Sequence, residues 1–236
     1  MTAQQVLGEL QPLGKTSYKR VLMNNHGVTE PCFGVPISEL KKFQKRFKHN
    51  HQLALDLYAT GNYDAMYLAG LVADPAQMTK PDLQRWLKNS QGGALGGTTL
   101  AGVAAESPHG RELALAWIDS GQSHVAAVGW ATLAHLVSIK PDAELNLPEL
   151  GQLLDRVRTT IHQAPDAVRY QMNAFVIATG SYVAALTALA LQVAEQVGPV
   201  TADLGNNSCH IPFAPDYIRK VQQRSRIGKK RHSARC

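Results

Sequence analysis

Apolar residues recur at intervals of three and four along most of the chain, which is the spacing of one face of an α-helix. The clearest stripe covers Leu147–Ile161, and a second with the same offsets covers Val183–Val197. A third starts at Ile37 directly after Pro36, a residue that suits the start of a helix. No segment of convincing length alternates between apolar and polar residues as a half-buried β-strand does. The pattern therefore predicts an all-α protein.

The predicted helices come in pairs joined by short turns. Leu53–Ala59 ends at Gly61, which suits a helix C-cap, and Asn62 can cap the helix that follows. Arg111–Ser120 and Ser123–Ser138 form another such pair. Helices joined by so short a turn are antiparallel. About eight to ten helices of roughly 10–18 residues, paired in this way, predict a HEAT-like α-α superhelical solenoid, with a compact helical bundle as the alternative.

The helical spacing stops after Gly198. Loop-like residues follow, and Pro215–Gln223 then predicts one short helix ahead of a basic tail. We therefore expect residues 1–198 to form the HEAT-like helical solenoid. Residues 199–236 are expected to form a C-terminal loop, a short helix and a basic tail attached to the same domain.

The formal net charge of +6 is distributed unevenly along the chain. Residues 217–236 include eight basic residues and no acidic one, and residues 15–48 include eight basic and two acidic residues. Residues 49–216 hold eight basic and fifteen acidic residues, a net charge of −7. Such asymmetry favours a polyanionic partner. Lysine-rich ends also keep a chain soluble, so charge alone leaves both interpretations open.

Several other classes of protein lack support in the sequence. No apolar run approaches the roughly 18 residues of a membrane span, and residues 1–15 lack the features of a secretory signal. We therefore expect a cytoplasmic protein without a membrane partner. Cys32, Cys209 and Cys236 are far apart and lack metal-site spacing, so we expect reduced thiols, no metal and no cofactor. Phosphate-binding loops and the common hydrolase motifs are also missing from the sequence.

Several segments, taken in order, resemble the DNA alkylation repair family. They are Phe33–Lys42 (FGVPISELKK), the helix pair Leu53–Asp74, Trp86, the region of Glu106, Trp117 and Ile118, and Val168–Phe175. The resemblance covers Lys15–Gly198, and the residues beyond it look like those of a divergent branch. It implies a HEAT-like solenoid. In members with glycosylase activity it also implies excision of positively charged, N-alkylated purines from DNA held along the concave surface.

The resemblance also locates the residues that such excision would need. The family stabilises the oxocarbenium-like sugar with a carboxylate and an aromatic face. The corresponding stretch here is the loop Gly92–Thr99, which contains neither. The family holds the backbone phosphate with an arginine, and the corresponding His124–Trp130 has none. A missing carboxylate would cost on the order of 2–4 kcal/mol of transition-state stabilisation. We therefore expect glycosylase chemistry of the 3-methyladenine/7-methylguanine type to be absent or altered, and whether the protein is an enzyme stays open.

The nearest substitutes for the missing catalytic groups are two acids and two aromatic residues. These weak candidates are Glu106, Asp119, Trp117 and Trp130. Each has a plainer interpretation, since the acids suit exposed helix ends and the tryptophans have apolar neighbours.

Nucleic-acid contacts are expected from three places. The candidates are His124 at a predicted helix start, Arg169 and Asn173 one turn apart on a helix, and the tail residues Arg224, Arg226, Lys229, Lys230, Arg231 and Arg235. The tail has no aromatic residue after Tyr217, so it can bind phosphates but cannot stack on bases. Binding through it would be independent of sequence and strongly salt-dependent. A solvated tail without a ligand is the alternative.

Two functions remain open from the sequence. The first is a DNA-binding protein of the alkylation repair type with weak or altered glycosylase chemistry. The second is a non-catalytic HEAT-like scaffold that holds a protein partner on its concave face, which the acidic central part of the chain favours.

Overall fold

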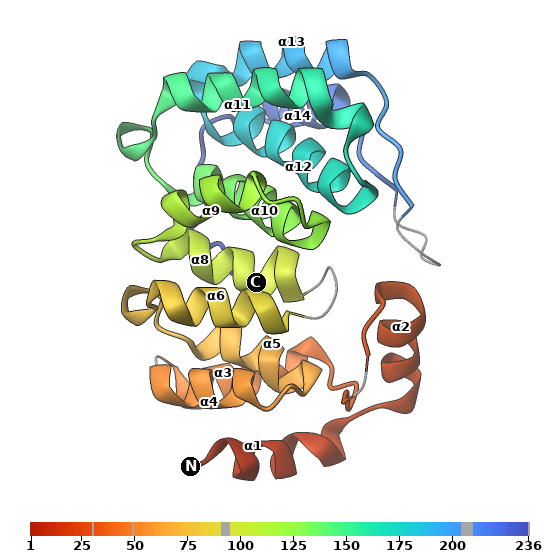
Figure 1. The fold of residues 1–236 in the computed structure, drawn as a ribbon, viewed down its shortest axis with the longest axis vertical. Helices are drawn as coiled ribbons and strands as arrows, with labels where there is room; N and C mark the ends of the chain where they lie inside the picture. Colours follow the sequence, from red (N-terminus) through yellow and green to blue (C-terminus); the bar gives the residue numbers. More distant parts are fainter. Residues whose placement is uncertain (30, 49, 91–94, 204–209, 236) are drawn as a thin grey trace. The chain divides into compact units, whose positions relative to one another are not determined.

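The structure is a computed structural model that describes residues 1–236 apart from 30, 49, 91–94, 204–209 and 236. The predictions for Cys209, Cys236 and residues 92–94 therefore lie outside the described part of the chain. Thirteen α-helices and no β-strand are present among the described residues, so the all-α prediction is confirmed (Figure 1). The helices are more numerous and shorter than expected, because several are separated by short 3₁₀ turns.

The chain forms two compact units. Among the described residues, unit 1 comprises residues 1–109 and Arg235, and unit 2 comprises residues 110–203 and 210–234. The segment after Gly198, which the sequence suggested as an appendage, contributes a helix to unit 2.

Unit 1 consists of short helices in chain order. These are α1 (Ala3–Leu10), η1 (Gln11–Leu13), α2 (Thr16–His26), α3 (Ile37–Phe47), α4 (His51–Ala59), α5 (Tyr63–Val72), η2 (Pro75–Gln77), α6 (Lys80–Asn89), η3 (Leu95–Leu100) and α8 (Ala101–Glu106). The predicted hairpin is confirmed, since α4 and α5 pack together across a turn at Gly61, which has φ +70. The Asn62 side chain caps α5 by accepting a hydrogen bond from the Ala65 N–H at 3.1 Å.

Two features of unit 1 differ from the sequence-based expectations. Helices α1 and α2 precede the first predicted helix, and α1 begins with a capping box formed by Thr2 and Gln5. The expected loop Gly92–Thr99 is helical from Leu95 onward, where η3 is a π-helical stretch that continues into α8. Burial of Leu95 and Leu100 explains the difference, because it holds a glycine-rich and threonine-rich segment in the core.

Unit 2 contains the longer helices. These are α9 (Gly110–Ile118), α10 (Ser123–Ile139), η4 (Asp142–Glu144), α11 (Leu147–Thr160), η5 (Ile161–Gln163), α12 (Asp166–Tyr182), η6 (Ala184–Leu186), α13 (Thr187–Val197) and α14 (Ala214–Gln223). Helix α10 packs against α9 and α12, and α12 also packs against α13 and α14. The core between them includes Trp130 and Phe175, whose ring centroids are 5.3 Å apart.

The two apolar stripes predicted in this region become helices with one shift of boundary. The stripe Leu147–Ile161 corresponds to α11. The stripe Val183–Val197 begins as the 3₁₀ turn η6, and α13 starts only at Thr187. Helix α12 runs on to Tyr182, and the segment Ala184–Val197 is bent from it by 113°, so the stripe begins at the bend between the two.

No single helix in the described ranges is both long and apolar enough to cross a membrane. Helix α12 and the segment Ala184–Val197 meet that criterion of length and composition only as a bent pair.

Candidate nucleic-acid interface

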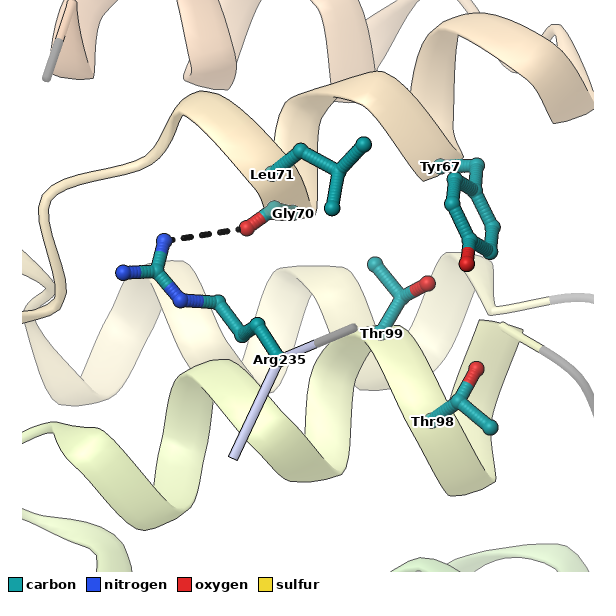
Figure 2. A pocket seen from close by; sticks show the side chains of 6 residues that line it. All are labelled: Tyr67, Gly70, Leu71, Thr98, Thr99 and Arg235. Carbon is teal, nitrogen blue, oxygen red and sulfur yellow. Dashed lines mark hydrogen bonds between the residues drawn. The ribbon is translucent and has the colours of Figure 1, made fainter. Parts of the chain in front are cut away.

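Glu106 and Arg235, which are 129 positions apart in the sequence, form an ion pair in unit 1. The Arg235 Nε lies 2.8 Å from the Glu106 Oε2, and both side chains are mostly buried. Arg235 also donates hydrogen bonds to the carbonyl oxygens of Gly70 at 3.1 Å and Ala73 at 2.8 Å, at the C-terminal end of α5. Figure 2 shows the guanidinium directed at the Gly70 carbonyl. The C-terminal end of a helix carries partial negative charge, so a cation is stabilised there.

A pocket next to this ion pair includes part of the stretch that corresponds to the catalytic segment of the family. Its lining residues are Tyr67, Gly70, Leu71, Thr98, Thr99 and Arg235 (Figure 2). Thr98 and Thr99 bring hydroxyl groups, which cannot stabilise a developing positive charge as a carboxylate does. Glu106, the candidate acid of unit 1, is held by Arg235 instead.

The remaining catalytic candidates lie in unit 2, where Asp119 and Trp130 contact Arg156. The Asp119 Oδ1 accepts a hydrogen bond from the Arg156 Nη1 at 2.6 Å, and the guanidinium lies 5.7 Å from the Trp130 ring centroid. Trp117 and Trp130 are buried in the core. Each of the two candidate acids therefore has a cationic partner, and neither indole offers an open face to a ligand.

Arg169 and Asn173 fix neighbouring segments of unit 2 to α12. The Arg169 guanidinium donates to the carbonyl oxygens of Ala164 and Thr201, the latter at 2.7 Å. The Asn173 Nδ2 donates to the Pro212 carbonyl at 3.0 Å, and the side chain is buried. These contacts connect the segments before and after residues 204–209 to α12. His124, by contrast, is exposed near the start of α10.

The basic tail packs on unit 2 and caps the C-terminal end of α10. The Lys230 Nζ donates to the Val137 carbonyl at 2.9 Å and lies 2.8 Å from the Asp142 Oδ1. The Arg231 N–H donates to the Ser138 carbonyl at 2.8 Å. Two of the tail cations singled out from the sequence, Lys230 and Arg235, are therefore bound to helix C-termini.

Among the described residues of unit 2, the cations that lack an acidic partner come from one stretch of the chain. Arginines and lysines from Arg111 to Arg219, and also Lys230, each lie within 4.0 Å of a carboxylate oxygen. Five others in the described part of this unit have no ion pair: Lys220, Arg224, Arg226, Lys229 and Arg231. We call these five residues the α14 cationic surface. The first four of them are exposed.

A second group of exposed cations lies on α3 and at its C-cap in unit 1. Lys41, Lys45 and Lys48 are spaced by four and three positions, which places them on one side of the helix. Their neighbours Lys42 and Arg46 pair with Glu39 and Glu9 respectively. The spacing of these residues in the sequence already indicates which of them share one side of the helix.

A buried carboxylate, which the sequence does not reveal as important, holds the backbone of Phe33–Val35 in place. The fully buried Asp64 accepts hydrogen bonds from the N–H groups of Phe33 at 2.6 Å, Gly34 at 3.2 Å and Val35 at 2.7 Å. Burial, and next the nearby charge of Asp64, raises the pKa of the Cys32 thiol to about 11. Cys32 forms no disulfide among the described residues, and at neutral pH its buried thiol is protonated and unreactive.

The fold and the site together define a class of helical-repeat protein in which short antiparallel helices carry cationic surfaces. Residues 6–202 match the family described as DNA alkylation repair enzyme. The protein therefore belongs to the DNA alkylation repair family, as its sequence segments suggested.

Two relatives and one solved structure are similar to this chain over nearly its whole length. An uncharacterised protein of Listeria monocytogenes is 30% identical over 233 residues, covering 96% of this chain and 100% of that protein. One of Listeria innocua is 30% identical over 231 residues, covering 95% and 99%.

The solved structure is 34% identical, covers 100% of both chains and has a TM-score of 0.92. It is described as belonging to a new family of proteins related to the HEAT-like repeat DNA glycosylases, with affinity for branched DNA structures. The HEAT-like prediction is thereby confirmed in preference to the compact bundle.

Proposed function

We propose that this protein binds DNA through the phosphate backbone, prefers branched DNA, and does not excise alkylated purines by a carboxylate-assisted mechanism. The observation that carries the proposal is the full-length similarity, at 34% identity, to a structure from a family with affinity for branched DNA. Unpaired cations on the chain itself support the same proposal.

The α14 cationic surface supplies positive charge that no carboxylate of the described residues neutralises. Each phosphate that such a cation neutralises releases condensed counterions, so binding weakens as salt increases. The lysines on the exposed side of α3 provide a second group of the same kind. These side chains contact phosphate without reading bases, which suits recognition of DNA shape rather than sequence.

The absence of carboxylate-assisted excision is supported by the partners of the candidate acids. Glu106 is bound by Arg235, and Asp119 is bound by Arg156. The Asp119 side chain is largely exposed, so its pair with Arg156 is weak. Glu106, by contrast, is mostly buried, and its guanidinium partner already neutralises much of its charge. Glu106 is therefore poorly suited to stabilise a cationic sugar, a contribution worth on the order of 10²–10³ in rate.

The binding experiment measures fluorescence anisotropy of a labelled four-way junction over a series of salt concentrations. Wild type is expected to bind at low salt with a steep negative slope of log affinity against log salt. The variant Arg226→Ala/Lys229→Ala should reduce the magnitude of that slope by about 2, one for each lost phosphate contact.

A matched control variant separates loss of site cations from loss of charge in general. Lys140→Ala/Arg158→Ala removes the same number of charges from unit 2, but both residues are paired, with Glu144 and Asp155. Its slope should match that of wild type. If wild type binds no DNA at low salt, the proposal fails and the protein-scaffold alternative takes its place.

The chemical half is tested by incubating the protein with DNA that contains N7-methylguanine and measuring free base. Release should be no faster than the spontaneous rate. Faster release that Glu106→Gln abolishes would contradict the proposal and make Glu106 a catalytic acid.

A further inference from the structure

Helix α14 carries an exposed stripe in which two aromatic residues continue into two cations. Phe213 at its N-cap, Tyr217, Lys220 and Arg224 at its C-cap follow at spacings of four, three and four positions. Such spacing places all four on one side of the helix. Phe213 is 40% exposed and Tyr217 is 47% exposed, and Lys220 and Arg224 are exposed members of the α14 cationic surface.

The opposite side of α14 is fixed in the core of unit 2. Ile218 has no exposed surface, and it packs so closely on α12 that a side chain at Gly180 would lie 2.6 Å from its Cδ1. Just before the helix, the Asn173 side chain holds the Pro212 carbonyl at 3.0 Å. On a third side, Arg219 pairs with Glu195 of α13 and with Asp216, the one acid of α14. The stripe is therefore presented outward on a rigid support.

Single exposed apolar side chains are ordinary in a folded protein, whereas exposed apolar side chains that are grouped often mark a binding surface. In the described part of the chain only three aromatic side chains are as exposed as these, namely Phe213, Tyr217 and Tyr170. Two of the three are one turn apart and adjoin unpaired cations. Neither aromatic ring is needed to fill the core.

Aromatic rings beside cations are the combination that binds single-stranded nucleic acid. The rings stack on unpaired bases, and each stacked base strengthens binding by about 5- to 150-fold, while the cations hold the phosphates of the same strand. In a continuous duplex the faces of the bases are covered by their neighbours. At a branch point base pairs lose a stacking neighbour, and their faces become accessible.

We propose that the stripe Phe213–Tyr217–Lys220–Arg224 recognises the branch itself, by stacking its two rings on bases left unstacked or unpaired at the branch point. Lys220 and Arg224 hold the phosphates that lead into the branch. This inference rests on the proposed function and assigns the preference for branched DNA to particular residues. It also amends the view from the sequence that this end of the chain has nothing with which to stack on bases.

The test uses a three-way junction with two unpaired bases and 2-aminopurine at the branch, together with a linear duplex of equal length. Binding of wild type should quench the 2-aminopurine fluorescence, because the probe stacks on a ring. The variant Phe213→Ala/Tyr217→Ala should remove the quenching and weaken junction binding by about tenfold or more, with duplex affinity unchanged.

Tyr170→Ala is the matched control, because Tyr170 is an exposed aromatic residue of unit 2 outside the stripe. It should leave quenching and both affinities unchanged. Tyr217→Trp and Tyr217→Leu separate stacking from folding, since both keep an apolar side chain on α14. The tryptophan variant should retain the junction preference, and the leucine variant should lose most of it.

The outcomes distinguish this inference from the proposed function. If wild type prefers the junction and the double-alanine variant prefers it equally, the stripe does not recognise the branch, and the proposed function stands without it. If the leucine variant behaves as wild type, stacking is likewise refuted. If wild type binds neither DNA, the proposed function itself has failed.

Discussion

Asp64 at the start of α5 has no exposed surface, yet it carries a carboxylate. The cost of removing this group from water is offset by three backbone N–H donors, those of Phe33, Gly34 and Val35. Gly34 has φ +78, and a side chain there would lie 2.6 Å from the backbone nitrogen of Lys19. The segment before α3 is therefore shaped by one buried acid and one required glycine.

Asp64→Asn should lower the free energy of unfolding by about 2–4 kcal/mol, because the amide NH₂ cannot accept a hydrogen bond and is directed at a backbone N–H. Urea denaturation followed by circular dichroism measures the change. Asp56→Asn is the control, since Asp56 is exposed and, within the described part of the chain, bonds only to Gln52. The control should change stability by less than about 0.5 kcal/mol. Equal effects of the two substitutions would show that Asp64 does not have this structural role.

At the residue scale, the sequence indicates residue chemistry better than residue partners. The apolar neighbours of Trp117 and Trp130 suggested core positions, and both side chains are buried. Nothing in the sequence indicates that Arg235 lies against Glu106, because their proximity depends on the path of the tail. For the same reason, the sequence could not separate the paired cation Lys230 from the unpaired Lys229.

Two helices end on a cation from a distant part of the chain. Arg235 donates hydrogen bonds to the C-terminal carbonyl oxygens of α5, and Lys230 donates one to the carbonyl oxygen of Val137 in α10. Carbonyl groups in the last turn of a helix have no partner within the helix, and a cation satisfies them while also opposing the helix dipole. Part of the basic tail therefore stabilises the fold.

Arg235→Ala should reduce the free energy of unfolding by about 1–3 kcal/mol, because it removes two hydrogen bonds to α5 and leaves the mostly buried Glu106 without its cation. Hydrogen exchange at the last turn of α5 should also become faster. Arg226→Ala serves as the reference, since Arg226 is exposed and has no side-chain partner in the described part of the chain. A stability loss of the same size in both variants would refute the capping role.

Helices α9 and α10 approach so closely that their backbones are in contact. A Cβ atom at Gly129 of α10 would lie 2.7 Å from the Ile118 backbone nitrogen and 2.9 Å from the Ala114 carbonyl oxygen of α9. Gly129→Ala should therefore force the helices apart and destabilise the protein by about 1–3 kcal/mol. Thermal melting provides the measurement.

Gly8→Ala is the control for Gly129→Ala. Gly8 also lies within a helix, α1, but no atom lies within 4 Å of a Cβ atom added there. Alanine is the better helix former, so this variant should be unchanged or up to about 1 kcal/mol more stable. Tolerance of alanine at Gly129 would mean that α9 and α10 are not in close contact.

At the element scale, long helices with clear apolar stripes were predictable and short ones were not. The stripe Leu147–Ile161 corresponds to α11 because its one buried face is continuous. Helices α1 and α2 were missed because they bury only three residues between them: Val6, Leu10 and Leu22. The sequence predicts a loop over Leu95–Thr99, most of the π-helical stretch Leu95–Leu100, because the glycines there obscure the signal of the two buried leucines that hold it in the core.

For the molecule as a whole, the structure divides the unevenly distributed basic residues into those that form ion pairs and those that do not. Among the described residues, most basic residues of unit 2 are paired with acids, and the five unpaired ones lie on α14 and in the segment that follows it, up to Arg231. Helix pairing predicted the HEAT-like class, and the ordered segments indicated the family. The sequence does not predict the stripe on α14. The exposure of its aromatic residues depends on which side of α14 packs against the rest of unit 2, and only the structure shows that.

The most direct test of the account is a competition experiment in which unlabelled DNA displaces a labelled four-way junction from the protein. An unlabelled junction should displace it at concentrations about tenfold or more below those needed for a linear duplex with the same number of base pairs, a difference of about 1.4 kcal/mol. Equal displacement by the two DNAs would contradict recognition of branched structure, and failure of wild type to bind the junction at low salt would contradict DNA binding itself.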